Sequence, residues 1–349
     1  MRLVGRILWV GLLIILLILV VGISVTVGWR PFIGPKARAL TNVTYERTPA
    51  RLARGKYLVE AVTQCMECHA PHDWTQHDSP ILPGMYGAGG GLPGRLIPPN
   101  LTSDPETGVA TWSDDQIARA IREGVGHDGR ALSPTMPYLY FSHLADEDVA
   151  SIVVYLRTLP PVRHKWPKSF IPYPVKYLIN NVPQPITHPI PLPDLSEPAR
   201  RGEYLVTIAH CTRCHTPQRR RGRYEAMGQP IRSLEFGGGV TTNGPWGRVA
   251  SANLTPDPSG ISYYDEALFI QTLRTGFVGK TRKISQYMPW TNFRNMTDED
   301  LKSIFAYLRT LPPVRHHVDN SEPPTYCPEC GATHGWGDKN RQLGTADPE

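Results

Sequence analysis

Two copies of one five-residue motif constrain this chain more than any other feature. Cys65-Met-Glu-Cys68-His69 and Cys211-Thr-Arg-Cys214-His215 each place two thiols three residues apart, with an imidazole directly after the second thiol. With 6 cysteines and 12 histidines in 349 residues, composition alone would give far fewer than one such match. The spacing is the attachment signature of c-type haem, where both thiols form thioether bonds and the imidazole binds the iron. A redox-active thiol pair and half of a zinc site are the alternatives, but neither explains a histidine in both copies.

Each motif stands at the head of a longer repeated unit. Three blocks recur in the same order: Arg-Gly-x-Tyr-Leu-Val at residues 54 and 201, Asn-Leu-Thr-x-Asp-Pro at residues 100 and 253, and Tyr-Leu-Arg-Thr-Leu-Pro-Pro-Val at residues 155 and 307. A repeat of this length indicates duplication of a whole domain rather than a solenoid. We therefore expect two tandem domains, one over residues 50–161 and the other over residues 199–315.

Helical patterns account for most of each unit. One helix is expected before the first cysteine motif, where Leu52, Tyr57 and Ala61 fall near helical spacing. Another begins after Ser113, which forms a capping box with Gln116, and ends before Gly124. A third runs from about Asp146 to Thr158, and its equivalent in the second unit opens at Thr297 and stops before Pro312. No alternating run is long enough for a sheet, so the pattern predicts an all-α fold.

Residues 7–28 form an apolar run without a charged side chain, which is long enough to span a bilayer. A cleaved signal peptide has a shorter apolar core followed by a small-x-small site, whereas the Ala-x-Ala sequence at residues 37–39 lies well past this run. We therefore expect a retained, single-pass transmembrane anchor. Basic residues flank both ends of the run, so charge alone gives no orientation.

A proline-rich segment separates the two units. Residues 160–198 contain eleven prolines, too many for a helix or a central strand. We interpret residues 162–198 as a stiff, extended linker that fixes how the domains face each other. Residues 175–181 in its middle are free of proline and suit a short contact segment.

A haem iron held by one histidine takes a sixth ligand, and the identity of that ligand decides function. Among seven methionines, only Met136 and Met288 recur at matched positions, each before a proline and after a polar loop. We expect both to bind iron through sulfur, which raises the potential and closes the iron to substrates; the ordinary role of methionine is to fill gaps in a core. Five histidines without a counterpart in the other unit are competing ligands: His72, His77, His127, His143 and His210.

Two further matched pairs each have two interpretations. Arg95 and Arg248 follow glycine at equivalent places, where a guanidinium either pairs with haem propionates or lies solvated at the surface. Asn100 and Asn253 either orient a propionate or cap a turn. The backbone carbonyl that should orient each proximal imidazole has no signature in the sequence.

A third cysteine pair, Cys327-Pro-Glu-Cys330-Gly331, lacks the adjacent histidine and should not hold haem. A local disulfide is the simplest expectation in an oxidising compartment. The second interpretation is a zinc site completed by His316, His317 or His334, although the second Cys-x-x-Cys of a zinc ribbon is missing. A free pair is the third. This pair lies in a polar C-terminal tail, residues 316–349.

The charge distribution argues against one class of partner. The chain has 37 basic and 31 acidic residues, a formal net charge of +6, and its basic residues are scattered apart from a cluster at residues 219–223. No predicted helix carries a face of basic and aromatic side chains. We therefore expect no nucleic-acid partner.

The repeated blocks, together with Trp112-Ser-Asp-Asp, Asp128-Gly-Arg and Met136-Pro-Tyr, resemble the cytochrome c subunits of bacterial membrane-bound dehydrogenases for alcohols, aldehydes and gluconate. The resemblance covers most of residues 50–161 and 199–315. It implies class I cytochrome c domains, ligation of iron by histidine and methionine, and passage of electrons from a dehydrogenase towards quinone or a terminal oxidase. Those subunits usually have three haem units, whereas this chain has two behind an N-terminal anchor.

These observations together predict an electron carrier rather than an enzyme. Two covalently bound haem c groups would receive electrons from a membrane or periplasmic redox partner and pass them to the respiratory chain. Because bacteria attach this haem outside the cytoplasm, residues from about 30 onward should lie on the periplasmic side of the cytoplasmic membrane. A dihaem peroxidase needs two unlike iron sites, and a haem-based sensor needs a signalling domain; the matched units favour neither.

Overall fold

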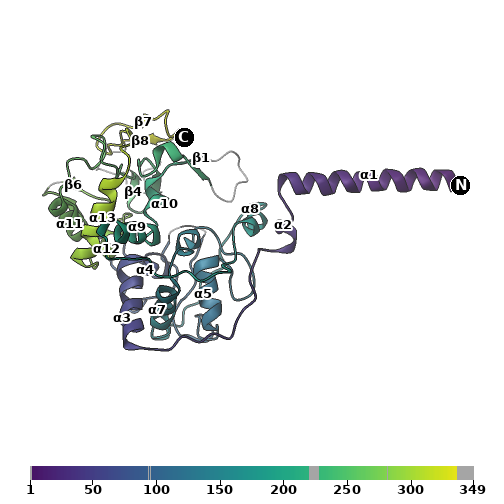
Figure 1. The fold of residues 1–349 in the computed structure, drawn as a ribbon, viewed down its shortest axis with the longest axis horizontal. Coiled ribbons are helices and arrows are strands. Elements are labelled where there is room, and N and C mark those ends of the chain that lie inside the picture. Colours follow the sequence, from purple (N-terminus) through teal and green to yellow (C-terminus); the bar gives the residue numbers. More distant parts are fainter. Residues whose placement is uncertain (1, 93, 95, 220–227, 281, 336–349) are drawn as a thin grey trace.

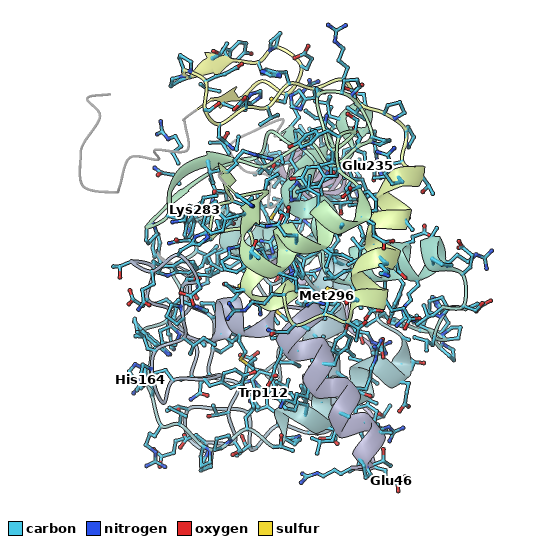
Figure 2. All side chains as sticks on the ribbon, turned by 90° about the vertical axis from the view of Figure 1, so that its left-hand side faces the viewer. Glu46, Trp112, His164, Glu235, Lys283 and Met296 are labelled. Carbon is cyan, nitrogen blue, oxygen red and sulfur yellow. The ribbon has the colours of Figure 1, made fainter. Side chains whose placement is uncertain are left out.

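The computed structural model describes residues 2–92, 94, 96–219, 228–280 and 282–335. Figure 1 shows a long helix that projects from a body in which the two repeated units lie against each other. In Figure 2, Glu46 lies near the far end of the first unit and Met296 of the second unit lies near their boundary. The structure is rich in helices, and these position the two cysteine motifs.

The projecting helix is α1 (Arg2–Thr26). Its stretch Val4–Thr26 is long and apolar enough to cross a membrane, and no part of the tested window is buried against the rest of the protein. A membrane anchor and an N-terminal signal sequence both fit that description. The short helix α2 (Arg30–Ile33) follows and contacts α8 (Val175–Leu178) and η2 (Ile179–Asn181), so the expected contact segment of the linker is helical.

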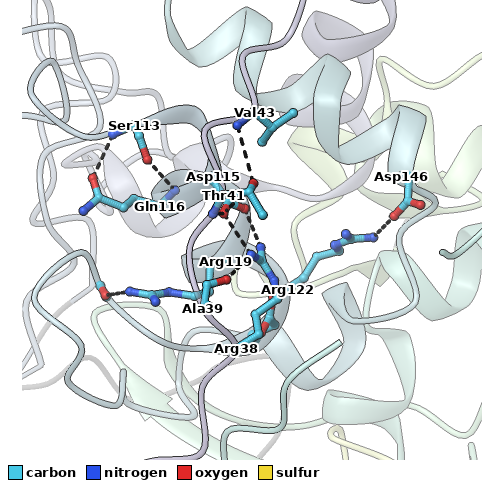
Figure 3. Close-up of polar contacts among 12 residues, drawn as sticks. Arg38, Ala39, Thr41, Val43, Ser113, Asp115, Gln116, Arg119, Arg122 and Asp146 are labelled. Carbon is cyan, nitrogen blue, oxygen red and sulfur yellow. Dashed lines mark hydrogen bonds and ion pairs between the residues drawn. The ribbon is translucent and has the colours of Figure 1, made fainter. Parts of the chain in front are cut away.

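The segment after α2 is fastened to the first unit by buried ion pairs (Figure 3). The Arg38 guanidinium donates to both oxygens of Asp115, at 2.5 and 2.8 Å, and to Glu123 at 2.8 Å. Burial alone would raise the pKa of Asp115, but its hydrogen bonds with Arg38 and Thr41 hold that pKa below its usual value. The chain between α1 and the first unit is therefore attached along its length and does not act as a free tether.

Both acidic residues belong to α5 (Asp114–Glu123), one of the helices expected from the sequence. Ser113 accepts a hydrogen bond from the Gln116 backbone, and the Gln116 side chain accepts one from the Ser113 backbone. Gly124 ends the helix in a left-handed conformation. The predicted capping box (Figure 3) and the stop signal at Gly124 are both confirmed.

A helix pair forms the centre of the first unit. Helix α3 (Pro49–Tyr57) packs against α7 (Asp146–Leu156), and η1 (Leu58–Val62) continues α3 as one wider π turn towards the cysteine motif. A β-carbon on Gly55 would lie 1.9 Å from the Ser151 carbonyl oxygen, so the two helices approach too closely for any side chain there.

The second unit repeats this arrangement. Helix α9 (Pro198–Ile208) packs against α13 (Asp298–Thr310), and a β-carbon on Gly202 would lie 1.9 Å from the Ser303 carbonyl oxygen. The N-terminus of α13 is capped by Thr297, as expected. The glycine of the repeated Arg-Gly-x-Tyr-Leu-Val block is therefore a packing residue in both units. The remaining helical elements of the two units are α6 (Tyr138–Phe141), η3 (Arg232–Leu234), α11 (Glu266–Thr275) and α12 (Trp290–Phe293).

Among the described residues, four short antiparallel strand pairs accompany the helices, so the fold is rich in helices but is not all-α as expected. The strand pairs are β1 (Gln218–Arg219) with β2 (Gln229–Pro230), β3 (Thr241–Gly244) with β4 (Gly247–Ala250), β5 (Phe277–Val278) with β6 (Arg282–Lys283), and β7 (Thr325–Tyr326) with β8 (Thr333–His334). Strands of two to four residues are too short to show an alternating pattern. In the β3–β4 pair, Gly244 and Gly247 pair at the turn.

The proline-rich segment runs along the first unit. The Trp166 indole donates to the Ala88 carbonyl at 2.7 Å, and Ile190 exchanges two hydrogen bonds with Asp146 at the start of α7. Between Val162 and Leu195 the segment has no helix or strand apart from α8 and η2, in keeping with its prolines. These contacts attach the segment to the first unit near both of its ends.

Candidate functional site

Each cysteine motif forms a one-turn helix. These are α4 (Cys65–His69) and α10 (Cys211–His215). The residues before them, Gln64 and His210, adopt left-handed backbone conformations with φ of 54° and 46°. This conformation is uncommon outside glycine, and its presence at both places shows that the two motifs are built alike.

Both motif histidines are buried and held by a backbone carbonyl. His69 Nδ1 lies 2.7 Å from the Pro99 oxygen, and His215 Nδ1 lies 2.7 Å from the Ala252 oxygen. Burial lowers the pKa of His69 to about 4 and also lowers that of His215, so both rings are neutral. With the proton on Nδ1, each Nε2 keeps a free lone pair that is able to bind a metal.

The two carbonyls escaped the sequence analysis, although each directly precedes the asparagine of a repeated block. The side chains of Asn100 and Asn253 hold the backbone next to these two carbonyls in place. Each side-chain oxygen accepts two hydrogen bonds from the threonine two residues later, and each amide donates to the carbonyl of Val162 or Val314. Of their two interpretations, the turn-capping role is the one these contacts support.

In the second unit, a cavity of about 1040 Å³ brings the candidate ligands together. Cys211, Cys214, His215 and Met288 all line it. Its remaining wall is largely apolar and includes Leu254, Phe269, Leu273, Phe293, Ile304 and Leu308. Two thiols, a neutral imidazole and a thioether in one large apolar cavity fit a covalently attached haem.

Met136 and Met288 lie in matching turns. Each methionine N–H donates to the carbonyl of a serine three residues earlier at 3.0 Å, namely Ser133 and Ser285. Each methionine carbonyl accepts from the residue two positions later, Tyr138 or Trp290. Both side chains are half-buried and pack against the core. The turn geometry is thus common to both units, and the ligand role of both sulfurs stays a prediction.

The competing histidines have other contacts. His72 uses both ring nitrogens, with the carbonyls of Ser79 at 2.6 Å and Met66 at 3.1 Å. His127 stacks on Trp112 at 4.3 Å between ring centroids, and His77 packs against Phe277 and Trp290. His143 is exposed. His210 lies among the residues that line the cavity. Of the two candidate partners for haem propionates, Arg248 lies in β4, and Arg95 lies outside the described residues.

The two cysteine motifs meet across the boundary between the units. Gln64 donates to the Ala209 carbonyl at 3.1 Å, which joins the residues just before α4 and α10. Arg213, inside the second motif, donates to the Thr135 carbonyl at 2.7 Å, next to Met136. Reciprocally, Glu67 inside the first motif accepts from Thr291 at 3.3 Å, three residues after Met288. The second motif therefore contacts the methionine loop of the first unit, and the first motif contacts α12, the helix that follows Met288 in the second unit.

A second reciprocal contact surrounds this meeting point. Asp148 is buried, binds Arg54 of its own unit through two bonds of 2.8 Å, and accepts from Tyr204 of the second unit at 2.7 Å. Asp300 is equally buried, binds Arg201 at 2.5 Å, and accepts from Tyr57 of the first unit. Burial and the bond to Asp300 raise the pKa of Tyr57 to about 12, so this tyrosine remains a neutral donor.

The arginines and tyrosines of this contact are the ones repeated in the Arg-Gly-x-Tyr-Leu-Val blocks. The block is therefore an interface motif as well as a packing motif. The blocks are visible in the sequence, but this role is not, because the partner of each tyrosine lies in the other unit.

Comparison with known proteins agrees with this geometry. Residues 52–160 match the family model described as cytochrome c. They carry the first motif, its carbonyl-held histidine and Met136. Residues 52–160 are therefore a cytochrome c domain.

Within that class, the chain is related to cytochrome c subunits of dehydrogenases. It is 29% identical over 296 residues to the fructose dehydrogenase cytochrome subunit of Gluconobacter japonicus, covering 76% of this chain and 55% of the relative. Over 294 residues it is 28% identical to the cytochrome c subunit of the alcohol dehydrogenase (quinone) of Gluconacetobacter polyoxogenes, covering 78% of this chain and 58% of the relative. A diheme cytochrome c-type protein of Cereibacter sphaeroides is 28% identical over 261 residues, covering 72% of this chain and 82% of the relative. The chain thus spans little more than half the length of the dehydrogenase subunits it matches.

Proposed function

We propose that this chain is a dihaem electron carrier with two tandem class I cytochrome c domains. Domain 1 spans residues 50–161, domain 2 spans residues 199–315, and residues 162–198 join them. The ligands of the first haem are Cys65, Cys68, His69 and Met136. Those of the second haem are Cys211, Cys214, His215 and Met288.

One observation carries the proposal: each cysteine motif contacts a residue within three positions of the candidate methionine ligand of the other unit. Arg213 reaches the carbonyl next to Met136, and Glu67 reaches a residue close to Met288. Two sites so joined are suited to exchange electrons with each other without a mobile intermediate. An enzyme with one open site would have no need of this reciprocal contact.

The residues around each site have separate tasks. Haem supplies one-electron chemistry at its iron when it is attached. His69 and His215 would bind the iron through Nε2, because Nδ1 is held by a carbonyl. Met136 and Met288 would each supply a sulfur ligand, which would favour the reduced state and keep other molecules from binding. The apolar side chains that line the cavity of the second unit would favour the less charged, reduced state further.

The test of function is the ligand state of the purified, full-length, haem-loaded protein in detergent. We expect two haem c groups per chain, a sulfur-to-iron absorption band near the red end of the oxidised spectrum, and two reversible one-electron waves in a potentiometric titration. Carbon monoxide and peroxide should leave both spectra unchanged. A high-spin signal from one haem, with peroxide consumption, would instead identify a dihaem peroxidase.

For partners, we propose that a dehydrogenase delivers the electrons and that quinone or an oxidase of the respiratory chain receives them. The support is the likeness to dehydrogenase subunits, including one whose name specifies quinone. The matched relatives are longer, so additional segments of those proteins have no equivalent among the aligned residues of this chain.

We propose that α1 stays in the cytoplasmic membrane and holds both haem domains on the periplasmic side, because haem is attached there. Haem-stained protein should remain in the membrane pellet after carbonate washing and dissolve only in detergent. Protease added to intact spheroplasts should digest the haem-stained domains. Release by carbonate would show that α1 is removed as a signal sequence. Protection from protease would place the haem domains on the cytoplasmic side of the membrane and contradict the proposal.

A further inference from the structure

The third cysteine pair lies in a cluster of four metal-binding side chains. His316, Cys327, Cys330 and His334 each present a nitrogen or sulfur, and these four atoms all lie within 4.8 Å of one another. His316 Nε2 is 3.3 Å from Cys327 Sγ, and His334 Nε2 is 3.4 Å from Cys330 Sγ. The cluster lies at the end of the second unit that faces away from the first, where β7 and β8 are labelled in Figure 1.

The two cysteines are held in a tight turn between β7 and β8. Cys327 N–H donates to the Ala332 carbonyl at 2.8 Å, and Gly331 N–H donates back to the Cys327 carbonyl at 2.9 Å. Gly331 adopts a positive φ of 71°, which a side chain would disfavour. The turn points both sulfurs to one side, as in the Cys-x-x-Cys knuckles of structural zinc sites.

The two histidines complete the set from different segments. His316 is 1% exposed, and its Nδ1 is engaged by the Gly237 carbonyl at 2.8 Å, so Nε2 is left to face Cys327. Its ring lies against Gly239, where a β-carbon would come within 2.6 Å of it. His334 is also buried and lies in β8, four residues after Cys330.

We propose that these four residues form a structural zinc site with two thiolate and two imidazole ligands. Zinc bonds of about 2.3 Å to sulfur and about 2.0 Å to nitrogen place tetrahedral ligand atoms about 3.3 to 3.8 Å apart. The two nitrogen–sulfur distances of 3.3 and 3.4 Å lie at the lower end of that range. Zinc binding displaces the two thiol protons to solvent, and the hydrogen bond that His316 Nδ1–H donates to the Gly237 carbonyl fixes the tautomer that binding requires.

A disulfide, the simplest expectation from the sequence, explains less of this arrangement. It would join Cys327 to Cys330 and leave the two buried imidazoles beside disulfide sulfurs, with no metal for both to bind. Both cysteines are free thiols in the structure. His317, the third histidine considered from the sequence, is exposed and pairs with Glu322 at 3.0 Å, so it is not a ligand.

The zinc site would fasten the C-terminal segment over the loop that holds His215. Gly237, which binds His316, is followed by Gly238, whose N–H donates to the His215 carbonyl at 2.9 Å. Asn320 exchanges two hydrogen bonds with Ala250, two residues before the carbonyl that orients His215. In the first unit the equivalent of His316 is His164, and a tryptophan two residues later, Trp166, covers the equivalent Gly90. The proposed zinc site thus replaces an aromatic cover used in the first unit.

The experiment is elemental analysis of the full-length, haem-loaded protein purified without chelators or added zinc. We expect one zinc per chain beside the haem iron. After denaturation with chelator and without reductant, a thiol reagent should count two thiols, because the other four cysteines are held in thioethers. A protein without zinc and without reactive thiols would have a Cys327–Cys330 disulfide. A third iron per chain in place of zinc would show that the site binds iron. Either result overturns the proposal.

Variants then test the ligands one at a time. Cys330→Ser and His316→Asn should each lose the zinc while haem content stays at the unaltered level, and His317→Asn should keep it. Loss of zinc from His317→Asn to the same extent would overturn the ligand assignment. If a ligand variant fails to accumulate, the metal and thiol counts of the unaltered protein still decide the proposal. Haem content, measured in the same samples, separates failure of this site from failure of haem attachment.

Discussion

Replacing Met288 with leucine is expected to lower the reduction potential of one haem and leave the other unchanged. Leucine matches methionine in volume and apolar character, so the cavity wall persists while the sulfur is lost. Axial ligands tune haem potentials over about 0.8 V, and loss of a methionine sulfur should shift this wave down by on the order of 0.1 V or more. About half of the red-end absorption band should disappear, and this one iron should become able to bind carbon monoxide.

The repeat provides matched controls for this experiment. Met136→Leu should have the same effect on the other wave, because its turn has the same hydrogen bonds. Met85→Leu removes a half-buried methionine that has no counterpart in the second unit, and it should change neither wave. Unchanged spectra and potentials in Met288→Leu would mean that the iron takes another ligand, and the proposal of a closed, transfer-only site would fail for that unit.

Features that repeat in the chain were open to prediction from sequence. A helix stop or a capping residue is a local property that the residue types at a helix end reveal. Ser113 with Gln116, and Thr297 at the start of its helix, were identified in this way and are confirmed. The cysteine motifs and the paired methionines stood out because each recurs in the same order in both units.

Backbone groups and long-range contacts were not open to prediction. The carbonyls of Pro99 and Ala252 hold the two imidazoles, but a carbonyl has no residue identity to detect. Tyr57 and Tyr204 were visible as repeated residues, whereas their partners depend on how the two units dock, which has no sequence period. For the same reason, the sequence left the role of the third cysteine pair open, because a local pattern cannot show that His316 lies beside Cys327.

The close approach of helices at Gly55 and Gly202 leads to the second large effect. Gly55→Ala should lower the free energy of unfolding by on the order of 3 kcal/mol, in the upper range for overpacked sites. The added β-carbon would lie 1.9 Å from the Ser151 carbonyl oxygen, which is backbone and unable to rotate away. Denaturant titration of the haem-loaded protein, followed by circular dichroism, measures the change.

The helix itself should tolerate alanine, which isolates the packing contribution. Alanine favours helices over glycine by up to about 1 kcal/mol, so any loss in Gly55→Ala reflects contact with α7 and not helix propensity. Lys56→Ala, at the next and exposed position, is the matched control and should leave the unfolding free energy nearly unchanged. Gly202→Ala should destabilise to a similar degree, since its β-carbon would also lie 1.9 Å from a carbonyl oxygen, that of Ser303. If Gly55→Ala behaves like Lys56→Ala, then α3 and α7 lie farther apart, and the Arg54–Asp148 contact that joins these two helices within the first unit would have to be looser as well.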